Sequence, residues 1–508
     1  MENKKCLVFV GRNDYMAMEA AADKVDEGYE IWFVGCDHSA GICHEGNFNS
    51  KVFCSFCSYT MRKQIYAFMK MHANTHYLKL ADLITTESRN NANSTVFNYE
   101  NVSELKAITY KGVDIGYGAF SNFVSQTRNV MPSFNSFFKE YINTILREEM
   151  MIADALLSLH EKEQFNFIVF HNGRFPNYKP AYCIARNNGI DYIATEVQTM
   201  ENVKYRNFFY NNLPHSFEAI NEKIERGWEK GNEEKYKIGK LFFENRYHSK
   251  PAGDKVYTKD QHAGELPEGF DKTKFNIAIF NSSEDEYFAI NKEYDDAVLF
   301  ENQYIALKTI FDHFKNDNTI HFYLRIHPNL ATVPYKSHTM LYDLKYDNVT
   351  IIPPKGTVSS YALMDACDNI VVFNSTMGME CSYWGKPVIA LSRDAYSLQD
   401  ITYNPKTPEE AFNLINDRKL VKKERPIENW LKVAYYYMGY GFDKFIHYPT
   451  KDYQIPLKPF KGSYKVLTVF KFMGSSKLQG LIQKFLEFTT RKNVASKYNA
   501  NVLAEKTK

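Results

Sequence analysis

Long apolar runs are missing from this chain of 508 residues. None of its hydrophobic stretches approaches the roughly 20 consecutive apolar residues that cross a lipid bilayer. The first residues, MENKKCLVFVGRND, contain an apolar run of about five residues, which is too short for the core of a secretory signal peptide. We therefore expect the protein to remain in the cytoplasm.

A large excess of charge of one sign is also missing, because 62 Lys and Arg residues are balanced by 60 Asp and Glu residues. The net charge of +2 gives the whole chain no general attraction to nucleic acid, and we expect no nucleic-acid partner. The exception is the segment 457–508, where 11 basic residues and two Glu residues give a net charge of +9.

Within this basic segment, apolar residues recur at helical spacing, at Leu478, Leu481, Ile482, Phe485 and Leu486. The spacing predicts a basic amphipathic helical tail that lies on an anionic membrane surface, which would hold the protein on the inner face of the plasma membrane. The first alternative is a helix that packs on the protein's own core or on a partner. The second is an RNA-binding segment, although the chain carries no nucleic-acid motif.

Cysteine is sparse, and the eight cysteines do not suggest a disulfide scaffold. Four of them lie within 22 residues: Cys36, Cys43, Cys54 and Cys57. The two-residue gap in Cys54-Ser-Phe-Cys57 is typical of a metal knuckle, so four thiolates would close a structural zinc site in a loop, with His38 or His44 as a possible replacement ligand. Free thiols are the alternative because six residues separate the first pair, and a redox or iron–sulfur role is a third interpretation.

Short strand patterns alternate with helical patterns along the chain. In the first half, the strands KKCLVFVG, YEIWFVG, FNFIVF and IDYIAT alternate with helices expected over 15–27, 134–161 and 178–188. In the second half, the strands FNIAIF, IHFYLRI, NVTIIPP and IVVF alternate with helices expected over 302–315 and 359–366. This alternation predicts parallel sheets and an α/β fold class.

A linker separates the two halves. The stretch SKPAGDKVYTKDQHAGELPEGFDKTK loses apolar periodicity and collects Gly, Pro and Asp, while the preceding segment 215–247 mixes Lys and Glu and predicts solvated helices at a domain edge. We therefore predict a Rossmann-like domain over 1–270, a second Rossmann-like domain over 271–456, and the tail over 457–508. Two such domains would face a cleft.

The run IVVFNSTMGMECSYWGKPVIA, residues 370–390, predicts a strand, a polar turn, a helix and a second strand. The turn offers hydroxyls and backbone N–H groups to an anion such as phosphate. Its four candidate residues are Asn374, Ser375, Thr376 and Gly378. One motif earlier, Arg325 and His327 leave the end of another strand, where they would neutralise charge on a phosphate.

Carboxylates at strand ends are the candidate general bases for activating an acceptor hydroxyl. The cluster Glu284, Asp285 and Glu286 follows the first strand of the second half. Adjacent carboxylates raise one another's pKa, which favours Asp285 or Glu286 as the base. A metal-binding role and a plain solvated loop are the alternatives.

The first half contributes the segment HNGR, where Asn172 and Arg174 follow a buried strand and are expected to contact the donor or acceptor across the cleft. His171 is either part of this site or a turn histidine. Glu196 ends the next strand, and it is either a base or the partner of Arg174 in a structural ion pair.

The motifs RIHPNL, NSTMGMEC and GKPVIAL, in this order, resemble the C-terminal half of GT-B-fold glycosyltransferases of bacterial capsule and O-antigen synthesis. The Arg-x-His-Pro element and the Ser-Thr turn before a Glu-bearing helix are also similar to sialyl and Kdo capsule transferases and to glycerophosphotransferases of teichoic acid synthesis. The HNGR and NSSEDEY segments are similar to capsule-cluster proteins. The resemblance covers roughly residues 165–200 and 275–395, and it implies that Glu380 accepts hydrogen bonds from a ribose. A surface glutamate is the alternative for Glu380.

The residues and the resemblance together predict a glycosyltransferase that moves a sugar from a UDP-, GDP- or CMP-linked donor to a glycan or lipid-linked acceptor of a capsule, O-antigen or lipopolysaccharide. The resemblance implies that 1–270 is the acceptor-side domain and 271–456 the nucleotide-sugar-binding domain. Catalysis is expected to need no metal and to be inverting. A nucleotide-sugar epimerase or a glycerophosphotransferase is the alternative within enzymes. A non-catalytic component of a surface-polymer assembly machine is the alternative outside them.

Overall fold

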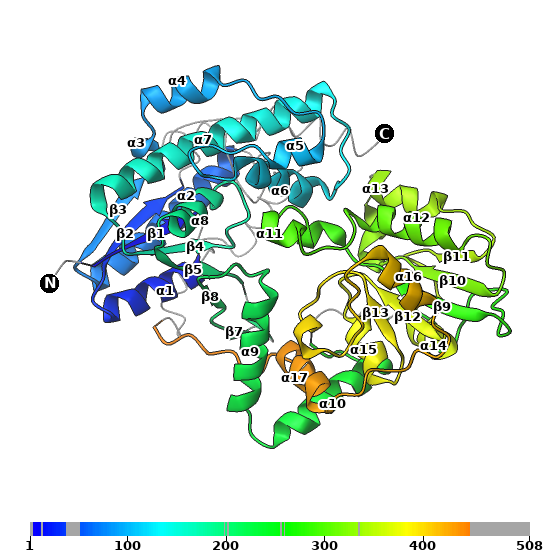
Figure 1. The fold of residues 1–508 in the computed structure, drawn as a ribbon. Helices are drawn as coiled ribbons and strands as arrows, with labels where there is room; N and C mark the ends of the chain where they lie inside the picture. The colour runs from blue at the N-terminus through cyan, green and yellow to red at the C-terminus, as the bar shows by residue number, and fades with distance from the viewer. Residues whose placement is uncertain are drawn as a thin grey trace.

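Two β-sheets, one in each half of the chain, organise the computed structural model, which describes residues 4–11, 14–36, 51–197, 199–200, 203–253, 257–258, 260–333 and 336–447. The first sheet has the order β3-β2-β1-β4-β5-β8 (Figure 1), with β8 antiparallel to β5 and the other pairs parallel. Its strands are β1 Lys5–Val10, β2 Glu30–Gly35, β3 Thr75–Lys79, β4 Phe167–His171, β5 Asp191–Thr195 and β8 Phe208–Tyr210. A separate antiparallel pair joins β6 Thr199–Met200 and β7 Val203–Lys204.

The second sheet is parallel throughout and has the order β11-β10-β9-β12-β13. Its strands are β9 Phe275–Phe280, β10 Ile320–Arg325, β11 Val349–Ile352, β12 Asn369–Val372 and β13 Val388–Ala390. When strands are numbered along the chain within each half, this spatial order, 3-2-1-4-5, is the same as that of the five parallel strands of the first sheet. The predicted fold class, with two Rossmann-like α/β halves, is therefore confirmed.

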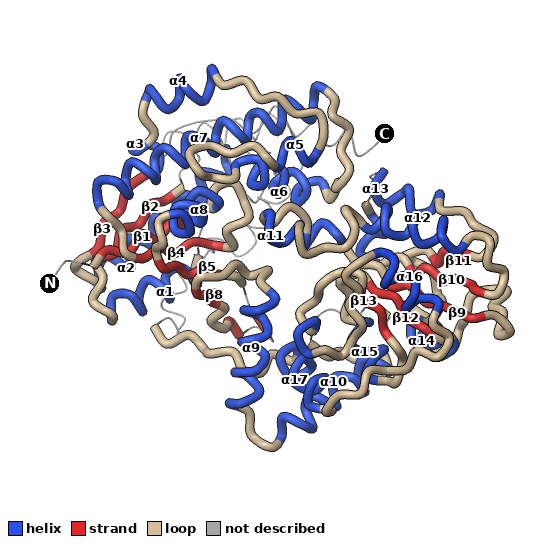
Figure 2. The backbone as a smooth tube through the Cα atoms, in the orientation of Figure 1, coloured by secondary structure: helices blue, strands red, loops and turns tan. Residues whose placement is uncertain are grey.

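Helices cover both faces of each sheet (Figure 2). In the first half they are α1 Tyr15–Asp26, α2 Lys51–Met71, α3 Leu80–Leu83, α4 Thr86–Ser94, α5 Val102–Lys106, α6 Ile115–Thr127, α7 Ser136–Glu163, α8 Lys179–Asn187, α9 Phe217–Lys230 and α10 Glu234–Tyr247. In the second half they are α11 Lys292–Asp295, α12 Gln303–Phe314, α13 Lys336–Thr339, α14 Ser360–Ala366, α15 Met377–Tyr383, α16 Pro408–Asn416 and α17 Glu428–Tyr437, with 3₁₀ turns η1 Glu284–Tyr287, η2 Pro328–Thr332, η3 Met340–Asp343 and η4 Ser397–Gln399.

Polar side chains fix where the main helices begin. Asp14 caps α1 by accepting a hydrogen bond from the Ala17 N–H (3.0 Å), and Asn302 caps α12 by accepting one from the Ile305 N–H (2.9 Å). The predicted helices over 15–27, 134–161, 178–188, 302–315 and 359–366 are all present within a few residues of their expected ends.

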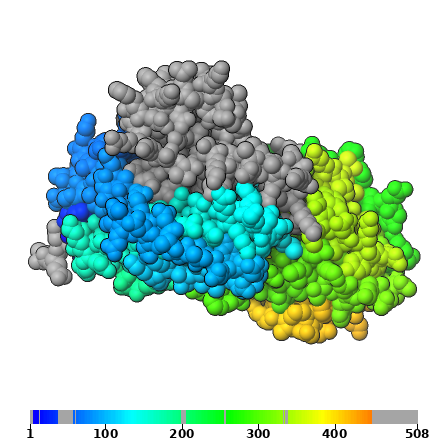
Figure 3. Space-filling model, turned by 90° about the horizontal axis from the view of Figure 1, so that it is seen from above, coloured from blue at the N-terminus to red at the C-terminus, as the bar shows by residue number. Residues whose placement is uncertain are grey.

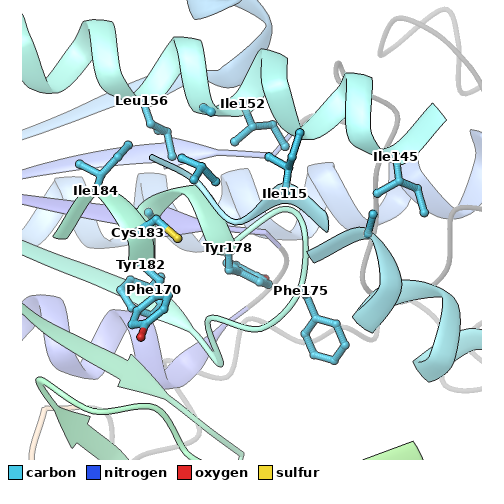
Figure 4. Close-up of a cluster of buried hydrophobic side chains, with 14 of the residues drawn as sticks. Ile115, Ile145, Ile152, Leu156, Phe170, Phe175, Tyr178, Tyr182, Cys183 and Ile184 are labelled. Atoms are coloured by element: carbon cyan, nitrogen blue, oxygen red, sulfur yellow. The ribbon is translucent and has the colours of Figure 1, made fainter. Parts of the chain in front are cut away.

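Alternate residues of the buried strands fill cores on opposite faces of the sheets. Leu7 and Phe9 of β1 pack with α6, α7 and α8, whereas Val8 packs with α1 and α2. Figure 4 shows the first of these cores, where Ile152 and Leu156 of α7 face Ile184 of α8. This burial on both sides explains why these strands are nearly continuous apolar runs.

Helices α9, α10 and α17 join the two halves at the lower edge of Figure 1. Trp228 of α9 and Phe243 of α10 are buried in one cluster with Trp430 of α17 and Met379 of the second half. The expectation of solvated helices over 215–247 is therefore wrong, because each helix buries aromatic residues in this cluster and α10 also buries Arg246.

After α17 the chain returns to the first half. The Arg206 N–H donates to the Asp443 carbonyl (2.8 Å), and the Ile446 N–H donates to Glu19 Oε1 (2.6 Å) on α1. His447 Nε2 lies 2.9 Å from Asp23 Oδ1. Residues 443–447, which the sequence assigned to the second domain, thus contact the first.

Among the described residues, no helix is both long and apolar enough to cross a bilayer. The tail over 457–508 lies outside the described residues, so its predicted helix and membrane contact stay predictions.

The return of the chain depends on a close backbone contact between two glycines. A Cβ on Gly441 would lie 2.4 Å from the Gly227 Cα, and Gly441 has a φ of +86°. Gly269 also has a positive φ, +72°, but its Cβ would meet nothing within 4 Å. We expect Gly441→Ala to lower the melting temperature clearly more than Gly269→Ala, since both variants suffer backbone strain of about 1 kcal/mol but only the first suffers the clash. Differential scanning fluorimetry checks this, and equal losses would contradict the close contact.

Candidate nucleotide-binding site

A hollow of about 540 Å³ opens at the carboxyl ends of β9, β10 and β12. The strand order reverses at β9, which has β10 on one side and β12 on the other. Ligands of open α/β sheets bind beyond the strand ends at such a reversal. Predicted site residues that line the hollow are Arg325, His327, Ser375, Thr376 and Glu380.

Arg325, the last residue of β10, brings a buried positive charge to this hollow. Its side chain donates from Nη1 to the Pro353 carbonyl (2.7 Å) and from Nη2 to the Gly356 carbonyl (3.0 Å), and the residue is only 3% exposed. Burial lowers the Arg325 pKa to about 10, and no carboxylate in the described part of the chain pairs with the guanidinium. The site therefore holds a cation whose counter-charge is left to a ligand.

His327 follows two residues later and is a neutral imidazole. Burial, and then the charge of Arg325, lower its pKa to about 4. Its Nδ1 accepts the Asn329 N–H (3.2 Å), so in the neutral ring the proton sits on Nε2. The ring packs edge-on to Tyr257, with centroids 4.9 Å apart. His327 thus offers a hydrogen bond and not the positive charge that the sequence suggested.

Arg246, from the end of α10, provides a second guanidinium to the hollow. Its Nε lies 3.4 Å from Glu380 Oε1, and its Nη2 donates to Thr376 Oγ1 (3.1 Å). Tyr361 donates from its hydroxyl to the other oxygen of Glu380. Glu380 is 2% exposed, so the alternative of a surface glutamate is wrong.

Residues of the turn before α15 line two different hollows. Ser375 and Thr376 face the hollow just described, whereas Asn374, with φ +46°, lines a neighbouring one. In the orientation that satisfies both polar atoms of its amide, Asn374 donates to Asp394 Oδ1 (2.6 Å). A Cβ on Gly378 would lie 2.2 Å from the Tyr396 hydroxyl, which donates to the Ser375 carbonyl (2.7 Å). Gly378 and Asn374 therefore shape the turn.

The acidic loop, residues 282–291 between β9 and α11, begins directly after Asn281, which lines the hollow, and its residue Glu284 lines the neighbouring hollow. Asp285 is buried, accepts from Ser283 Oγ (2.7 Å) and lies 3.6 Å from the Arg128 Nε, and its charge partly counteracts the fall of the His327 pKa. Glu286 is exposed. Burial raises the pKa of Glu284 to about 8, while Glu284 caps α12 through the Gln303 N–H (2.8 Å). The loop is thus not simply solvated.

The HNGR turn of the first half faces this acidic loop. Asn172 and Gly173 both have positive φ, and Asn172 Nδ2 donates to Glu196 Oε2. Arg174 donates from Nη1 to the Glu286 carbonyl (2.9 Å), so in the described structure it bonds the loop and no ion pair joins it to Glu196. His171 is buried and packs edge-on to Tyr178.

The predicted zinc site lies partly outside the described residues. Cys43 and the side chain of Cys54 lie outside the described residues. Cys54 and Cys57 belong to helix α2 and not to the loop we expected. Zinc binding by Cys36, Cys43, Cys54 and Cys57 stays a prediction.

Sequence reasoning missed Arg246, Tyr257 and Tyr361. Arg246 sits among mixed charges whose spacing suggested solvent, and Tyr257 belongs to the segment that was interpreted as a linker. The spacing of α10 offered one signal for Arg246. Arg246 follows Phe242 by four residues and therefore lies on the same helical face as buried aromatic side chains.

Comparison with known proteins connects this half of the chain to capsule synthesis. Residues 284–425 match the model of a family described as capsule polysaccharide biosynthesis protein. The match includes Arg325, His327 and the turn at 374–380, so the resemblance to capsule-synthesis proteins is confirmed for this segment. No curated protein matches the chain.

Solved structures with likeness to the chain are distant. They include the β-Kdo 2,4 transferase KpsC of Thermosulfurimonas dismutans, with a TM-score of 0.33 and 15% identity over 54% of this chain and 80% of its own. They also include a UDP-GlcNAc 2-epimerase of Neisseria meningitidis, with a TM-score of 0.22 and 10% identity over 85% of this chain and 98% of its own. Likeness at this level carries no conclusion about activity.

The depressed pKa of His327 predicts a specific acid sensitivity. Between pH 6.5 and about 4 the unfolded chain binds a proton at His327 that the folded protein does not, so the free energy of unfolding falls as the pH falls through this window. The shift corresponds to a loss on the order of 3 kcal/mol. On going from pH 7.5 to pH 5, we expect His327→Gln to lose roughly 3 °C less in melting temperature than the wild type.

The exposed His248 provides the control, since His248→Gln should lose as much as the wild type over the same pH range. A His327→Gln protein that loses as many degrees as the wild type would show that His327 is not held neutral by its surroundings.

Proposed function

We propose that this protein is a glycosyltransferase that moves a sugar from a nucleotide-activated donor to a bacterial surface polysaccharide. The observation that carries the proposal is Arg325, a buried guanidinium without a carboxylate partner among the described residues, at the strand ends where α/β sheets bind their ligands. A buried charge is costly unless it is paired, and the phosphate of a nucleotide sugar would pair it.

The other groups of the hollow suit the rest of a nucleotide sugar. The proton on His327 Nε2 and the Ser375 hydroxyl are hydrogen-bond donors for phosphate oxygens. Glu380 keeps acceptor capacity for ribose hydroxyls beside its contacts with Arg246 and Tyr361. In this arrangement the developing negative charge of the leaving phosphate is stabilised by Arg325 and Arg246.

Transfer also needs a base for the acceptor hydroxyl. Asp285 is our first choice because it is buried, follows Asn281 of the hollow by four residues and interacts with His327. Glu286 and Glu196 stay candidates, with Glu196 oriented by Asn172. Attack by the activated hydroxyl on the sugar carbon would expel the nucleotide in a single inverting step, and we propose that the step needs no metal.

The family match supports surface-polysaccharide synthesis as the setting, since it covers Arg325, His327 and Glu380. We propose a glycan or lipid-linked acceptor and action at the inner face of the membrane, with the basic segment 457–508 as the membrane contact.

The proposal predicts that donor binding depends on the two guanidinium groups. Arg325→Met and Arg246→Met should each weaken nucleotide-sugar affinity by roughly 30-fold, because each removes a charge-assisted hydrogen bond worth about 2 kcal/mol. Titration calorimetry with UDP-, GDP- and CMP-sugars checks this. Arg418→Met is the control, since Arg418 is exposed and stacks on Phe275 away from the hollow.

Turnover with and without acceptor separates the reaction classes. We expect donor consumption that requires an added glycan acceptor. Conversion of the donor to an isomer without any acceptor would instead identify an epimerase. Wild-type affinity for nucleotide sugars in both Arg325→Met and Arg246→Met would show that the assigned site is wrong.

A further inference from the structure

The acidic loop belongs to the second half by sequence but is built into the core of the first. Ala289 and Ile290 are fully buried members of the hydrophobic cluster formed by α6, α7 and α8, and Phe288 packs edge-on to Phe120 of α6 at 5.9 Å. Helix α11, which follows this loop, lies between the two halves in Figure 1, and the halves lie directly against each other in Figure 3. The loop therefore follows β9 of the second half but is anchored in the core of the first.

Lys179, the first residue of α8, makes the most buried polar contact with this loop. Its side chain is completely inaccessible to solvent, and its Nζ donates to the Ile290 carbonyl at 2.7 Å. The ammonium lies near the rings of Tyr117 and Tyr182, at 5.9 and 5.5 Å from their centroids. A lysine buried this deeply is unusual, and in the described part of the chain the hydrogen bond that its ammonium makes goes to the loop.

Other contacts hold the same loop from the first half. Arg174 donates to the Glu286 carbonyl, and Tyr117 and Lys106 both bond Asp295 Oδ2, at 3.0 and 2.7 Å. Ala289 adopts a φ of +56°, a conformation that a non-glycine residue keeps only where its surroundings impose it. The backbone from 286 to 295 is thus fixed by the first half at several points.

Along the chain, Asp285 lies between the residues that line the hollow at Arg325 and the residues that the first half holds. It follows Phe280 and Asn281, which line the hollow, by only a few residues, and it precedes the carbonyl held by Arg174 by one. Its distance from a bound donor is therefore set by how the first half holds the loop.

We propose that Lys179 is a positioning residue for sugar transfer, which holds the Ile290 carbonyl and thereby keeps Asp285 in reach of the reacting centre. The inference rests on the proposed function, because it takes Asp285 as the base. Lys179 itself lines none of the hollows named above and contacts no group assigned to the donor. It acts on the rate of transfer and not on donor affinity.

The test is Lys179→Met, which keeps the length of the side chain and removes the donor group. We expect kcat to fall at least tenfold, donor Kd to change less than twofold, and hydrogen–deuterium exchange to accelerate in the segment 284–296. Lys24→Met is the matched control, since Lys24 is also a buried lysine of the first half but forms an ion pair with Glu27 of the same half. It should leave kcat and the exchange of 284–296 unchanged.

A double-mutant cycle shows whether Lys179 acts through Asp285. If it does, Lys179→Met should lower kcat little further in a protein that already carries Asp285→Asn. The inference is overturned if the fold-loss of kcat in the double variant equals the product of the losses in the two single variants. It is also overturned if the kcat of Lys179→Met stays within twofold of the wild type. Should Lys179→Met fail to fold, Arg174→Met releases the same loop at the Glu286 carbonyl and must show the same faster exchange and lower kcat.

The outcomes also separate this inference from the proposed function. If the wild-type protein transfers sugar and Lys179→Met and Arg174→Met have the same kcat as the wild type, the inference is overturned but the proposed function is not. A wild-type protein that transfers no sugar removes the proposed function, and the positioning role falls with it.

Discussion

A positive charge buried without a counter-charge is the feature on which the site depends. The Arg325 guanidinium is held in place by two carbonyls, which orient it but do not neutralise it. Burial, and then the charge of Arg325, lower the pKa of the neighbouring His327 and keep it neutral, which makes that residue a hydrogen-bond donor. The strand reversal at β9 brings this charge, the Ser375 turn and the Arg246–Glu380 pair to one hollow.

The two halves of the chain are not independent bodies joined only by a linker. Helices α9 and α10 follow the first sheet but share a core with α17 and with Met379 of the second half. Residues 443–447 return to α1, and the acidic loop enters the first core at Ala289 and Ile290. Because Arg325 and Ser375 follow strands of the second sheet and the acidic loop is held by the first half, the relative positions of these groups depend on this interlocking.

The strands and the strand-end motifs could be predicted from sequence, because buried parallel strands are apolar runs and polar residues directly after them meet at one edge. Arg325, His327 and Ser375 were found in this way. Arg246 was missed because its contribution comes from a tertiary contact between α10 and α15, and local charge spacing gives no sign of that contact. The role of Lys179 was invisible for the same reason. Asn374 and Gly378 lie in the predicted turn, but their roles there depend on contacts with Asp394 and Tyr396, some twenty residues away.

The central claim is that the hollow recognises the phosphate of a nucleotide through buried cations. The most direct measurement is titration calorimetry of the wild-type protein with a nucleoside and with its phosphorylated forms, for uridine, guanosine and cytidine in turn. The account predicts that one series binds only when phosphate is present and that its affinity falls as salt is raised. Equal binding of the nucleoside and its phosphates, or no binding in any series, would contradict it.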